Sequence, residues 1–314
     1  PFPRDLVGTY SCHGVEPLYD VYEYEGGEED KEEVGPTTVA KINQDRGSVA
    51  FPYGNCPRTA LFAAYDGHGE GGELVAQFAM TEIQRRLHKH PLFMKDVDTA
   101  FRHTFIEVDK ALRTQNSIEP LYSGSTACAV LIRDNTLTIS NVGDSRAVLA
   151  RRRKNSSALT PINLSIDQNP DSPGEQDRIE RCGGFVSPPP EEGLSARVWL
   201  DPEFTQIGLA MSRSIGDHAV KRIGVIAEPV VTTHELTNED EFMIIATDGV
   251  WEFIDSEEAI TIVGQYFAYG DGASRACQGL IEVAASKWHE HEGDYRDDIT
   301  ALVVRIRDVR QWWM

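Results

Sequence analysis

The sequence predicts an α+β fold in layers, with antiparallel sheets packed inside and helices outside. Two observations predict it. Apolar, β-branched runs of strand length recur, and several are joined by turns too short to hold a crossover helix. Segments in which apolar residues recur at helical spacing follow one another in pairs, without a strand between them. Helix pairs that alternate with antiparallel strands are typical of layered α+β proteins.

Six runs are the strand candidates: residues 60–65, 126–132, 136–142, 147–151, 242–247 and 299–306. The turn at residues 133–135 joins the second run to the third. The turn Gly143-Asp144-Ser145 joins the third to the fourth. We therefore expect an antiparallel meander over these three strands.

Four helices are expected, at residues 73–88, 96–114, 256–268 and 272–289. In the first, Leu74, Phe78, Ile83 and Leu87 share one face. No internal repeat or Pro/Gly/Ser-rich linker divides the chain, so residues 1–314 are expected to form a single domain. Two surface segments are expected on it: an acidic loop at about residues 23–35 and a basic insertion at about residues 151–162.

The charge and cysteine content narrow the class of protein. The 314 residues carry a formal net charge of -20, which disfavours nucleic acid and anionic membranes as partners. Five cysteines, odd in number and without a CxxC pair, argue against a disulfide framework and a zinc ribbon. No apolar run is long enough to span a membrane. We expect a cytoplasmic protein, with the nucleus as an alternative; a targeting segment upstream of Pro1 would not be visible.

The stretch around Asp66 is the most informative. An apolar strand ends at Asp66-Gly67, and a helix follows. The spacing of Gly67, Gly69 and Gly72 also satisfies the G-x-G-x-x-G dinucleotide pattern, but the carboxylates of Asp66 and Glu70 would repel a pyrophosphate. A carboxylate fixed at a strand end beside glycine suits a hard divalent cation.

Three further carboxylates have comparable positions. Asp248 ends an apolar strand and is followed by glycine, Asp297 precedes the last strand, and Asp45 lies in Asn43-Gln44-Asp45. Carboxylates within about 4 Å repel by about 4 kcal/mol at an effective dielectric constant of about 20, so a cluster needs protons or cations. Oxygen ligands select magnesium, manganese or calcium over zinc. Two such ions can hold a bridging water for in-line attack on a phosphoryl group, which predicts phosphoester hydrolysis.

Seven stretches together resemble the PPM, or type 2C, family of metal-dependent serine/threonine protein phosphatases. They occur in the family's order, and they are residues 43–45 (NQD), 65–69 (YDGHG), 123–127 (SGSTA), 141–146 (NVGDSR), 209–217 (LAMSRSIGD), 246–252 (ATDGVWE) and 297–300 (DDIT). The resemblance covers roughly residues 8–307. It implies a four-layer α-β-β-α sandwich, two antiparallel sheets packed face to face and flanked by helices, with a metal cleft at one end.

The resemblance also implies roles for individual residues. Asp66 would bridge two Mg²⁺ or Mn²⁺ ions, the Gly67 carbonyl would bind one of them, and Asp248 with Asp297 would hold the other. Asp45 would act largely through metal-bound water, and His68 would be the general acid. Asp144 and Glu252, with Asp248, would hold a possible third ion. A flap at about residues 187–206 would lie beside the cleft. The expected substrates are phosphoproteins, and the expected oligomeric state is a monomer.

One departure from the family pattern concerns phosphate binding. Many members have an arginine where this chain has Ala40, and Lys41 is the nearest cation. We therefore assign phosphate binding to Lys41, although a lysine lacks the bidentate geometry of an arginine. The basic run Arg151-Arg152-Arg153-Lys154 is another deviation, and it is either a docking patch or a solvated loop.

Other interpretations stay open on sequence alone. A catalytically weak pseudophosphatase that acts as a binding module is the main alternative, and a hydrolase of phosphorylated metabolites is another. The run His289-Glu290-His291 is either a transition-metal site or two solvated histidines. Trp312 and Trp313 either pack on the domain or contact a partner.

Overall fold

The computed structural model describes residues 2–18, 38–154, 156, 158–190 and 195–312. The predicted acidic loop at about residues 23–35 lies outside these residues. So do part of the predicted flap, Trp313 and the side chain of Trp312.

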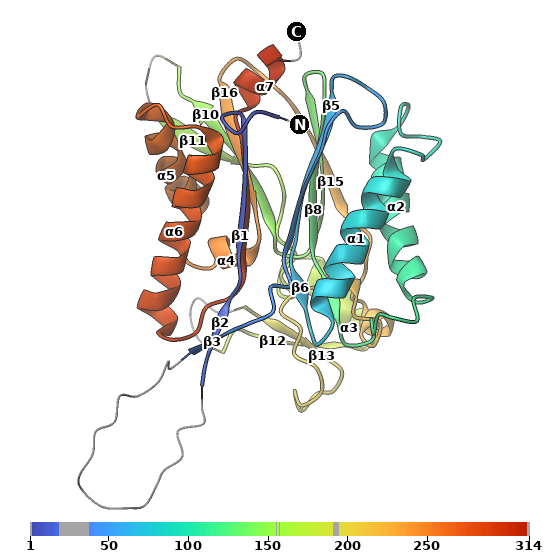
Figure 1. Ribbon diagram of the computed structural model, residues 1–314. Coiled ribbons are helices and arrows are strands. Elements are labelled where there is room, and N and C mark those ends of the chain that lie inside the picture. The colour runs from blue at the N-terminus through green and yellow to red at the C-terminus, as the bar shows by residue number, and fades with distance from the viewer. Residues whose placement is uncertain (1, 19–37, 155, 157, 191–194, 313–314) are drawn as a thin grey trace, which may run out of the picture.

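Two five-stranded antiparallel sheets form the centre of the molecule (Figure 1). Sheet I has the strand order β1-β17-β16-β10-β11, and sheet II has the order β15-β9-β8-β5-β4. The strands of sheet I are β1 (Val7–Cys12), β17 (Ile299–Val304), β16 (Asp240–Ala246), β10 (Arg146–Arg152) and β11 (Leu159–Asn163). Those of sheet II are β15 (Val230–Glu235), β9 (Thr136–Val142), β8 (Ala127–Arg133), β5 (Thr59–Tyr65) and β4 (Arg46–Ala50).

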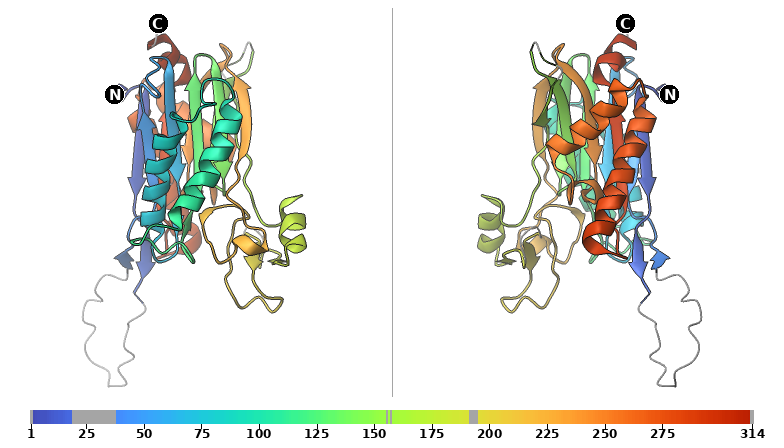
Figure 2. Two further views of the ribbon diagram at one scale, coloured as in Figure 1. Left: turned by 90° about the vertical axis from the view of Figure 1, so that its right-hand side faces the viewer. Right: turned by 90° about the vertical axis from the view of Figure 1, so that its left-hand side faces the viewer.

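Helix pairs cover the outer faces of the two sheets, which confirms the predicted α-β-β-α sandwich (Figures 1 and 2). Helices α5 (Ser256–Ala268) and α6 (Ala273–Glu292) pack on sheet I, and α1 (Gly72–Leu87) and α2 (Val97–Leu112) pack on sheet II. The remaining helices are α3 (Glu175–Arg181), α4 (Asp248–Trp251), α7 (Ile306–Trp312) and the 3-10 turn η1 (Lys221–Ile223). The short strands are β2 (Val15–Pro17), β3 (Thr38–Ala40), β6 (Gly67–His68), β7 (Gly124–Ser125), β12 (Phe185–Ser187), β13 (Arg197–Trp199) and β14 (Ile215–Gly216).

The two-residue period of the strands divides the core into layers. In β5, Leu61 and Ala63 face the helices, whereas Phe62 and Ala64 face sheet I. All four are fully buried, because each sheet has an apolar layer on both faces. This is why the central strands have continuous apolar sequences and no polar alternation.

The structure corrects two of the strand predictions. The three-strand meander is wrong, because β9 belongs to sheet II and β10 to sheet I, so Gly143-Asp144-Ser145 carries the chain between sheets. The predicted basic insertion also contains β11, which pairs with β10 through the register Leu149↔Ile162. Its proline and polar residues weaken the strand signal in the sequence.

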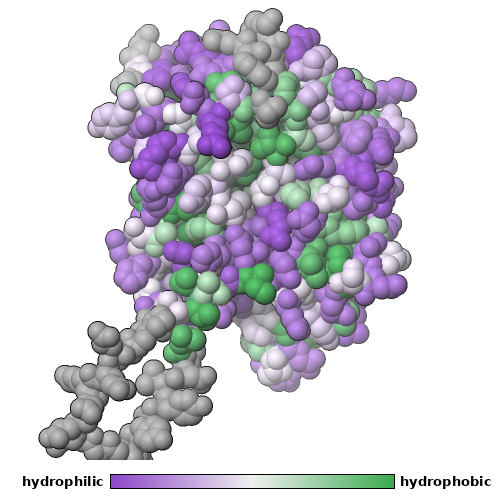
Figure 3. Space-filling view, viewed as in Figure 1, coloured by the Kyte–Doolittle hydropathy of each residue, from purple (hydrophilic) through white to green (hydrophobic). Residues whose placement is uncertain are grey.

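The face predicted for α1 is also partly wrong. Ile83 and Leu87 are buried as expected, but Leu74 is 43% exposed, and Val75, Ala76 and Ala79 are buried instead. The face of the molecule seen in Figure 3 is mainly hydrophilic, with scattered apolar groups. The small side chains of Ala76 and Ala79 let α1 lie close to sheet II.

A small apolar cluster supports the flap region at one end of the sandwich (Figure 2). It consists of Ile179, Val198, Val220, Ile223 and Val225. Glu175 of α3 accepts hydrogen bonds from Arg178 and Arg213, which ties this region to the segment leading into β14.

The five cysteines are all free, as expected from their number and spacing. Within the described part of the chain, no helix is long and apolar enough to cross a membrane.

Replacing Ile83 by alanine should lower the free energy of unfolding by about 2–5 kcal/mol, because its side chain is fully buried between α1 and sheet II. The matched variant Leu74→Ala removes a largely exposed side chain from the same helix and should cost less than about 1 kcal/mol. Urea denaturation measures both. Equal losses would contradict the assignment of the buried face.

Candidate metal centre

The strand register brings the predicted carboxylates to one end of the sandwich. Arg46 of β4 pairs with Tyr65 of β5, so Asp45 and Asp66, the next residues outward, are neighbours. In sheet I, Ala246 of β16 pairs with both Arg146 of β10 and Ala301 of β17. This register places Asp144, Asp248 and Asp297 at the same end of sheet I. Spacing in the sequence could not show this convergence.

Asp45 is linked across the two sheets by a threonine. The Thr247 hydroxyl donates a hydrogen bond of 2.7 Å to Asp45 Oδ2 and accepts one of 3.1 Å from the Thr300 backbone N–H. The other carboxylate oxygen of Asp45, Oδ1, is buried and has no hydrogen-bond partner among the described residues.

Asp66 is held by its backbone. Its N–H donates to Thr126 Oγ1 over 2.9 Å, and its C=O accepts from the Thr126 N–H over 2.8 Å. The following residue must be glycine, because a Cβ on Gly67 would lie 2.4 Å from the Gly72 carbonyl oxygen. These backbone contacts therefore fix the position of Asp66 at the end of β5.

Burial and mutual repulsion raise the pKa values of four carboxyl groups at this end of the sandwich. The pKa of Asp66 lies well above its ordinary value because of burial and the nearby charges of Asp248 and Asp45. Burial and the charge of Asp297 raise the pKa of Asp248 to about 6. Burial and the charge of Asp248 raise that of Asp144 to about 7. Burial and the charge of Asp144 also raise the pKa of Glu252.

The donor set fits hard divalent cations. Asp45 Oδ1, Asp144 Oδ1 and Asp248 Oδ1 are buried carboxylate oxygens without a partner in the described part of the chain, which is costly unless a proton or cation satisfies them. These side chains do not already form a closed ligand set. No group of three or more His, Cys, Asp or Glu side chains in the described residues stands in an arrangement that could hold an ion.

The two adjacent aspartates before β17 have different contacts. Asp298 is buried and accepts hydrogen bonds from the backbone N–H groups of Gly14 and Gln44, so it holds the loop that carries Asp45. Asp297 is more exposed and forms an ion pair of 2.9 Å with Lys41.

Lys41 is fixed beside the cluster. Its ammonium group lies 3.4 Å from the Tyr295 hydroxyl and 5.1 Å from the centre of the Tyr295 ring. Burial opposes the charge of Lys41, but Asp297 outweighs this effect and raises the pKa of the ammonium group. Lys41 is therefore a fixed cation.

His68 forms a pair that sequence reasoning did not identify. Its Nε2 lies 2.8 Å from Oδ2 of Asp217, which is 5% exposed. Burial opposes protonation of the imidazole, but Asp217 prevails and raises the pKa of His68. The Nδ1 atom is buried and has no partner in the described chain. Asp217 lies in the stretch at residues 209–217, but nothing in that stretch indicates contact with residue 68.

A cavity of 360 Å³ opens beside the carboxylates, between α4, the end of α6 and the flap region. Asp144, Asp248, Asp297 and Glu252 line it. The cations that line it are Arg146 and Arg197, and Lys41 is not among the residues that do. Arg146 is engaged by Asp167 at 2.6 Å and lies over the Trp251 ring.

Two alternative interpretations of short motifs find no support. The glycines at residues 67–72 follow a strand of an antiparallel sheet, not the parallel βαβ unit that a dinucleotide site requires. His291 stacks on Phe253 at 4.6 Å, and His289 Nδ1 lies 2.9 Å from the Gly293 carbonyl oxygen. These two imidazoles therefore have structural contacts at the end of α6.

Solved structures show the class of fold. The serine-threonine phosphatase 2C from Toxoplasma gondii superposes with a TM-score of 0.76 at 21% identity, over 95% of this chain and 94% of that one. A bacterial serine phosphatase superposes with a TM-score of 0.59 at 15% identity, over 96% and 97% of the two chains. The fold is thus that of the phosphatase 2C sandwich.

Sequence comparisons identify the family. The family model described as Protein phosphatase 2C matches residues 44–293. A protein of Oryza sativa subsp. japonica, "Probable protein phosphatase 2C 64", is 36% identical over 85% of this chain and 63% of its own length. "Probable protein phosphatase 2C 35" of Arabidopsis thaliana is 32% identical over 87% of this chain and 81% of its own length. The chain belongs to the protein phosphatase 2C family of serine/threonine phosphatases.

Without divalent cations, Asp248→Asn should stabilise the protein at pH 8 by about 1–2 kcal/mol and have little effect near pH 4. The folded-state pKa of about 6 is above the ordinary value of 3.8, so the wild-type carboxyl loses stability as pH rises through this interval. Urea denaturation with chelator at both pH values measures the effect. With Mg²⁺ or Mn²⁺ present, the variant should instead be the less stable protein. A destabilisation at pH 8 in chelator that equals or exceeds that at pH 4 would contradict the repulsion.

Proposed function

We propose that the chain hydrolyses phosphoserine and phosphothreonine in proteins, using two Mg²⁺ or Mn²⁺ ions. One observation carries the proposal: buried, unpartnered carboxylate oxygens from both sheets gather at one end of a phosphatase 2C sandwich. Such a cluster is unfavourable in a resting protein unless cations bind there. The family match supports the same chemistry.

Asp66, the Gly67 carbonyl, Asp248 and Asp297 are the proposed ligands, with Asp45 in support. Asp144 and Glu252 are proposed for a third ion. When bound, two such ions activate water as a nucleophile and stabilise charge on the phosphoryl group. Thr126 fixes the backbone of Asp66, and Thr247 fixes the side chain of Asp45, so neighbouring residues restrain two of these proposed groups.

His68 is the proposed proton donor to the leaving serine or threonine oxygen. In the imidazolium form both ring nitrogens carry protons. Asp217 holds the Nε2 proton and stabilises the charged form, so the Nδ1 proton is the one available for transfer. Asp217 is therefore proposed as a positioning residue for His68.

Lys41 is proposed to attract the substrate phosphate as a fixed charge. Its ion pair with Asp297 places an ammonium group directly beside a proposed metal ligand. That ligand and Tyr295 line the same cavity, although Lys41 does not. Asp297 orients the ammonium group, so Lys41 approaches a phosphate as a point charge and not as a bidentate clamp.

Phosphate release from a phosphothreonine peptide should require Mn²⁺ or Mg²⁺ and stop with excess chelator. Asp66→Asn should reduce kcat/KM by about a hundredfold or more, because an amide is a weaker ligand and leaves the ion less neutralised. Asp98→Asn, in the first turn of α2, is the matched control and should leave the rate unchanged.

Two outcomes would overturn the proposed function. One is an absence of metal-dependent turnover by the wild-type chain, which would favour a non-catalytic binding module. The other is full turnover by the Asp66→Asn variant. Faster hydrolysis of phosphorylated sugars than of the peptide would instead point to a metabolite phosphatase.

His68→Gln should slow release from alkyl phosphoserine far more than from p-nitrophenyl phosphate, whose leaving group needs little protonation. Asp217→Asn should have the same selectivity. It should also move the alkaline limb of the phosphoserine pH–rate profile to lower pH, because it removes the charge that raises the pKa of His68. Asparagine tolerates the left-handed backbone of this position, where φ is 49°.

The readout is kcat/KM for both substrates across pH. Equal losses on the two substrates in His68→Gln would argue against proton donation. An unshifted alkaline limb in Asp217→Asn would argue against the pairing.

A further inference from the structure

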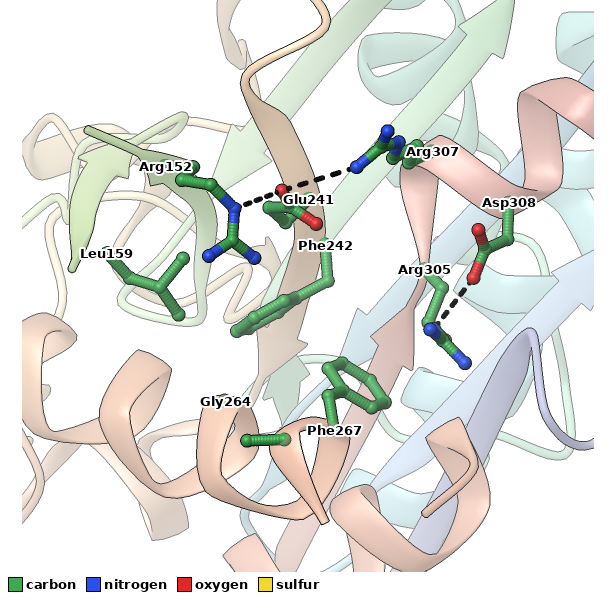
Figure 4. Close-up of a pocket in the computed structure, with 10 residues that line it drawn as sticks. Arg152, Leu159, Glu241, Phe242, Gly264, Phe267, Arg305, Arg307 and Asp308 are labelled. Carbon is green, nitrogen blue, oxygen red and sulfur yellow. Dashed lines mark hydrogen bonds and ion pairs between the residues drawn. The ribbon is translucent and has the colours of Figure 1, made fainter. Parts of the chain in front are cut away.

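A second, larger cavity lies at the far end of sheet I from the candidate metal centre. It has a volume of 510 Å³ and is lined by residues of β10, β11, β16, α5 and α7 (Figure 4). Glu241 and Phe242, which line it, are the second and third residues of β16, whereas Asp248 follows the end of that strand. Asp248 lies six positions after Phe242, and an extended chain spans about 20 Å over that distance.

The floor of this cavity is apolar. Phe242 and Phe267 meet edge to face, with ring centres 5.1 Å apart (Figure 4). Leu159 also lines the cavity. Gly264 leaves space in the wall formed by α5. A Cβ at this position would lie 2.7 Å from the Leu159 Cδ1 atom, so the lack of a side chain helps to keep the cavity open.

The rim of the cavity carries arginines. Arg305 stacks over the Phe267 ring at 4.8 Å and pairs with Asp308 at 2.8 Å. Arg152 and Arg307 both approach Glu241, at 2.6 and 3.8 Å (Figure 4). The Glu241 carboxylate thus forms ion pairs with two guanidinium groups, and its longer pair, with Arg307, is weak.

The basic rim continues into a neighbouring cavity of 540 Å³, which shares Arg152, Glu241 and Arg307 with the first. Arg153 and Lys154 line this second cavity. Together the two linings contain five cations (Arg152, Arg153, Lys154, Arg305 and Arg307) against three acids (Glu239, Glu241 and Asp308). The two linings thus carry a net positive charge, which is opposite in sign to the net charge of -20 on the whole chain.

Arg151, the first residue of the basic run at residues 151–154, lines neither cavity. It therefore differs from the other three residues of that run. It pairs at 2.7 Å with the buried carboxylate of Asp240, next to His234. The register of β10 on β16 shifts between Ala150 and Arg151, and bulges of this kind re-aim the side chains around them. Arg151 is therefore structural, whereas Arg152, Arg153 and Lys154 line the paired cavities.

We propose that the paired cavities dock an acidic peptide segment of a partner protein, with one bulky apolar side chain anchored in the first cavity beside Leu159, Gly264 and Phe267. The reversed charge selects an acidic ligand, since a basic rim on an acidic protein attracts anions and repels other basic surfaces. Two connected cavities, one with an apolar floor and one basic, fit an extended chain better than a compact molecule. The docking site is separate from the proposed reaction site and does not depend on its activity.

Binding of a short fluorescein-labelled peptide, glutamates around one central phenylalanine, to the whole chain is the test, followed by fluorescence anisotropy. The same peptide with serine in place of phenylalanine, and a lysine-based version, are the comparison probes. The phenylalanine peptide should bind at low salt, weaken as salt rises, and bind at least about tenfold more tightly than the serine peptide. The lysine peptide should not bind.

Two variants separate charge from shape. Arg305→Gln/Arg307→Gln removes rim charge and should weaken binding by about tenfold. Gly264→Met fills the apolar cavity without changing charge and should weaken the phenylalanine peptide more than the serine peptide. Arg310→Gln is the matched control, because it removes an arginine of α7 that bonds to Asn135 and Thr237 and lines neither cavity. Hydrolysis of p-nitrophenyl phosphate and thermal unfolding check that each variant is folded.

Loss of peptide binding in both rim and cavity variants, with Arg310→Gln unaffected, would support the docking site. Equal binding by wild type and both variants would overturn it. So would equal affinity for the phenylalanine and serine peptides, which would reduce the rim to a nonspecific anion surface. Self-association of the wild type that both variants abolish would assign the cavities to a second copy of this chain and would also overturn the proposal.

Discussion

Electrostatic repulsion among buried carboxylates is the constraint on which the functional end of this protein depends. Asp45 and Asp66 lie at strand ends of sheet II, whereas Asp144, Asp248 and Asp297 lie just beyond strand ends of sheet I. The pKa values of Asp66, Asp144 and Asp248 are raised because the fold holds these carboxyl groups closer to other carboxylates, and farther from water, than their charges favour. The apolar layers supply the stability that such an arrangement requires, because burial of the sheets on both faces offsets the local cost.

Much of the fold was predictable because the central strands and helices have strong local signals. The segment 256–268 matches α5, and Thr136–Val142 matches β9. The failures have physical causes. The turn at Gly143 looks like a hairpin turn, but the change from sheet II to sheet I depends on side-chain packing on both faces, which no local pattern encodes. Strands β1, β4 and β15 are half exposed and polar on one face, so their apolar signal is weak.

The site was predictable in its residue types but not in its contacts. Asp-Gly at strand ends marked Asp66 and Asp248, the positions of Asp45 and Asp297 made them further candidates, and the family resemblance added metal-binding roles for Asp144 and Glu252. The partnership of His68 with Asp217 joins positions 149 residues apart, and it arises only when β7 lies between β6 and β14. Lys41 likewise meets Asp297 through a contact that links the two ends of the chain. Pairings of this range follow from topology, and a single sequence does not contain them.

The Thr247 hydroxyl links the two sheets at the functional end of the sandwich. It accepts from Thr300 within sheet I and donates to Asp45 beside sheet II, so one oxygen fixes the offset between the two layers at the functional end. The distance between the carboxylates of the two sheets therefore depends on the thickness of the core between the sheets. Residues such as Phe62 and Met243, which touch no ligand, help to set that gap. Changes in the interior of the protein can thus alter the spacing of these carboxylates without replacing any of them.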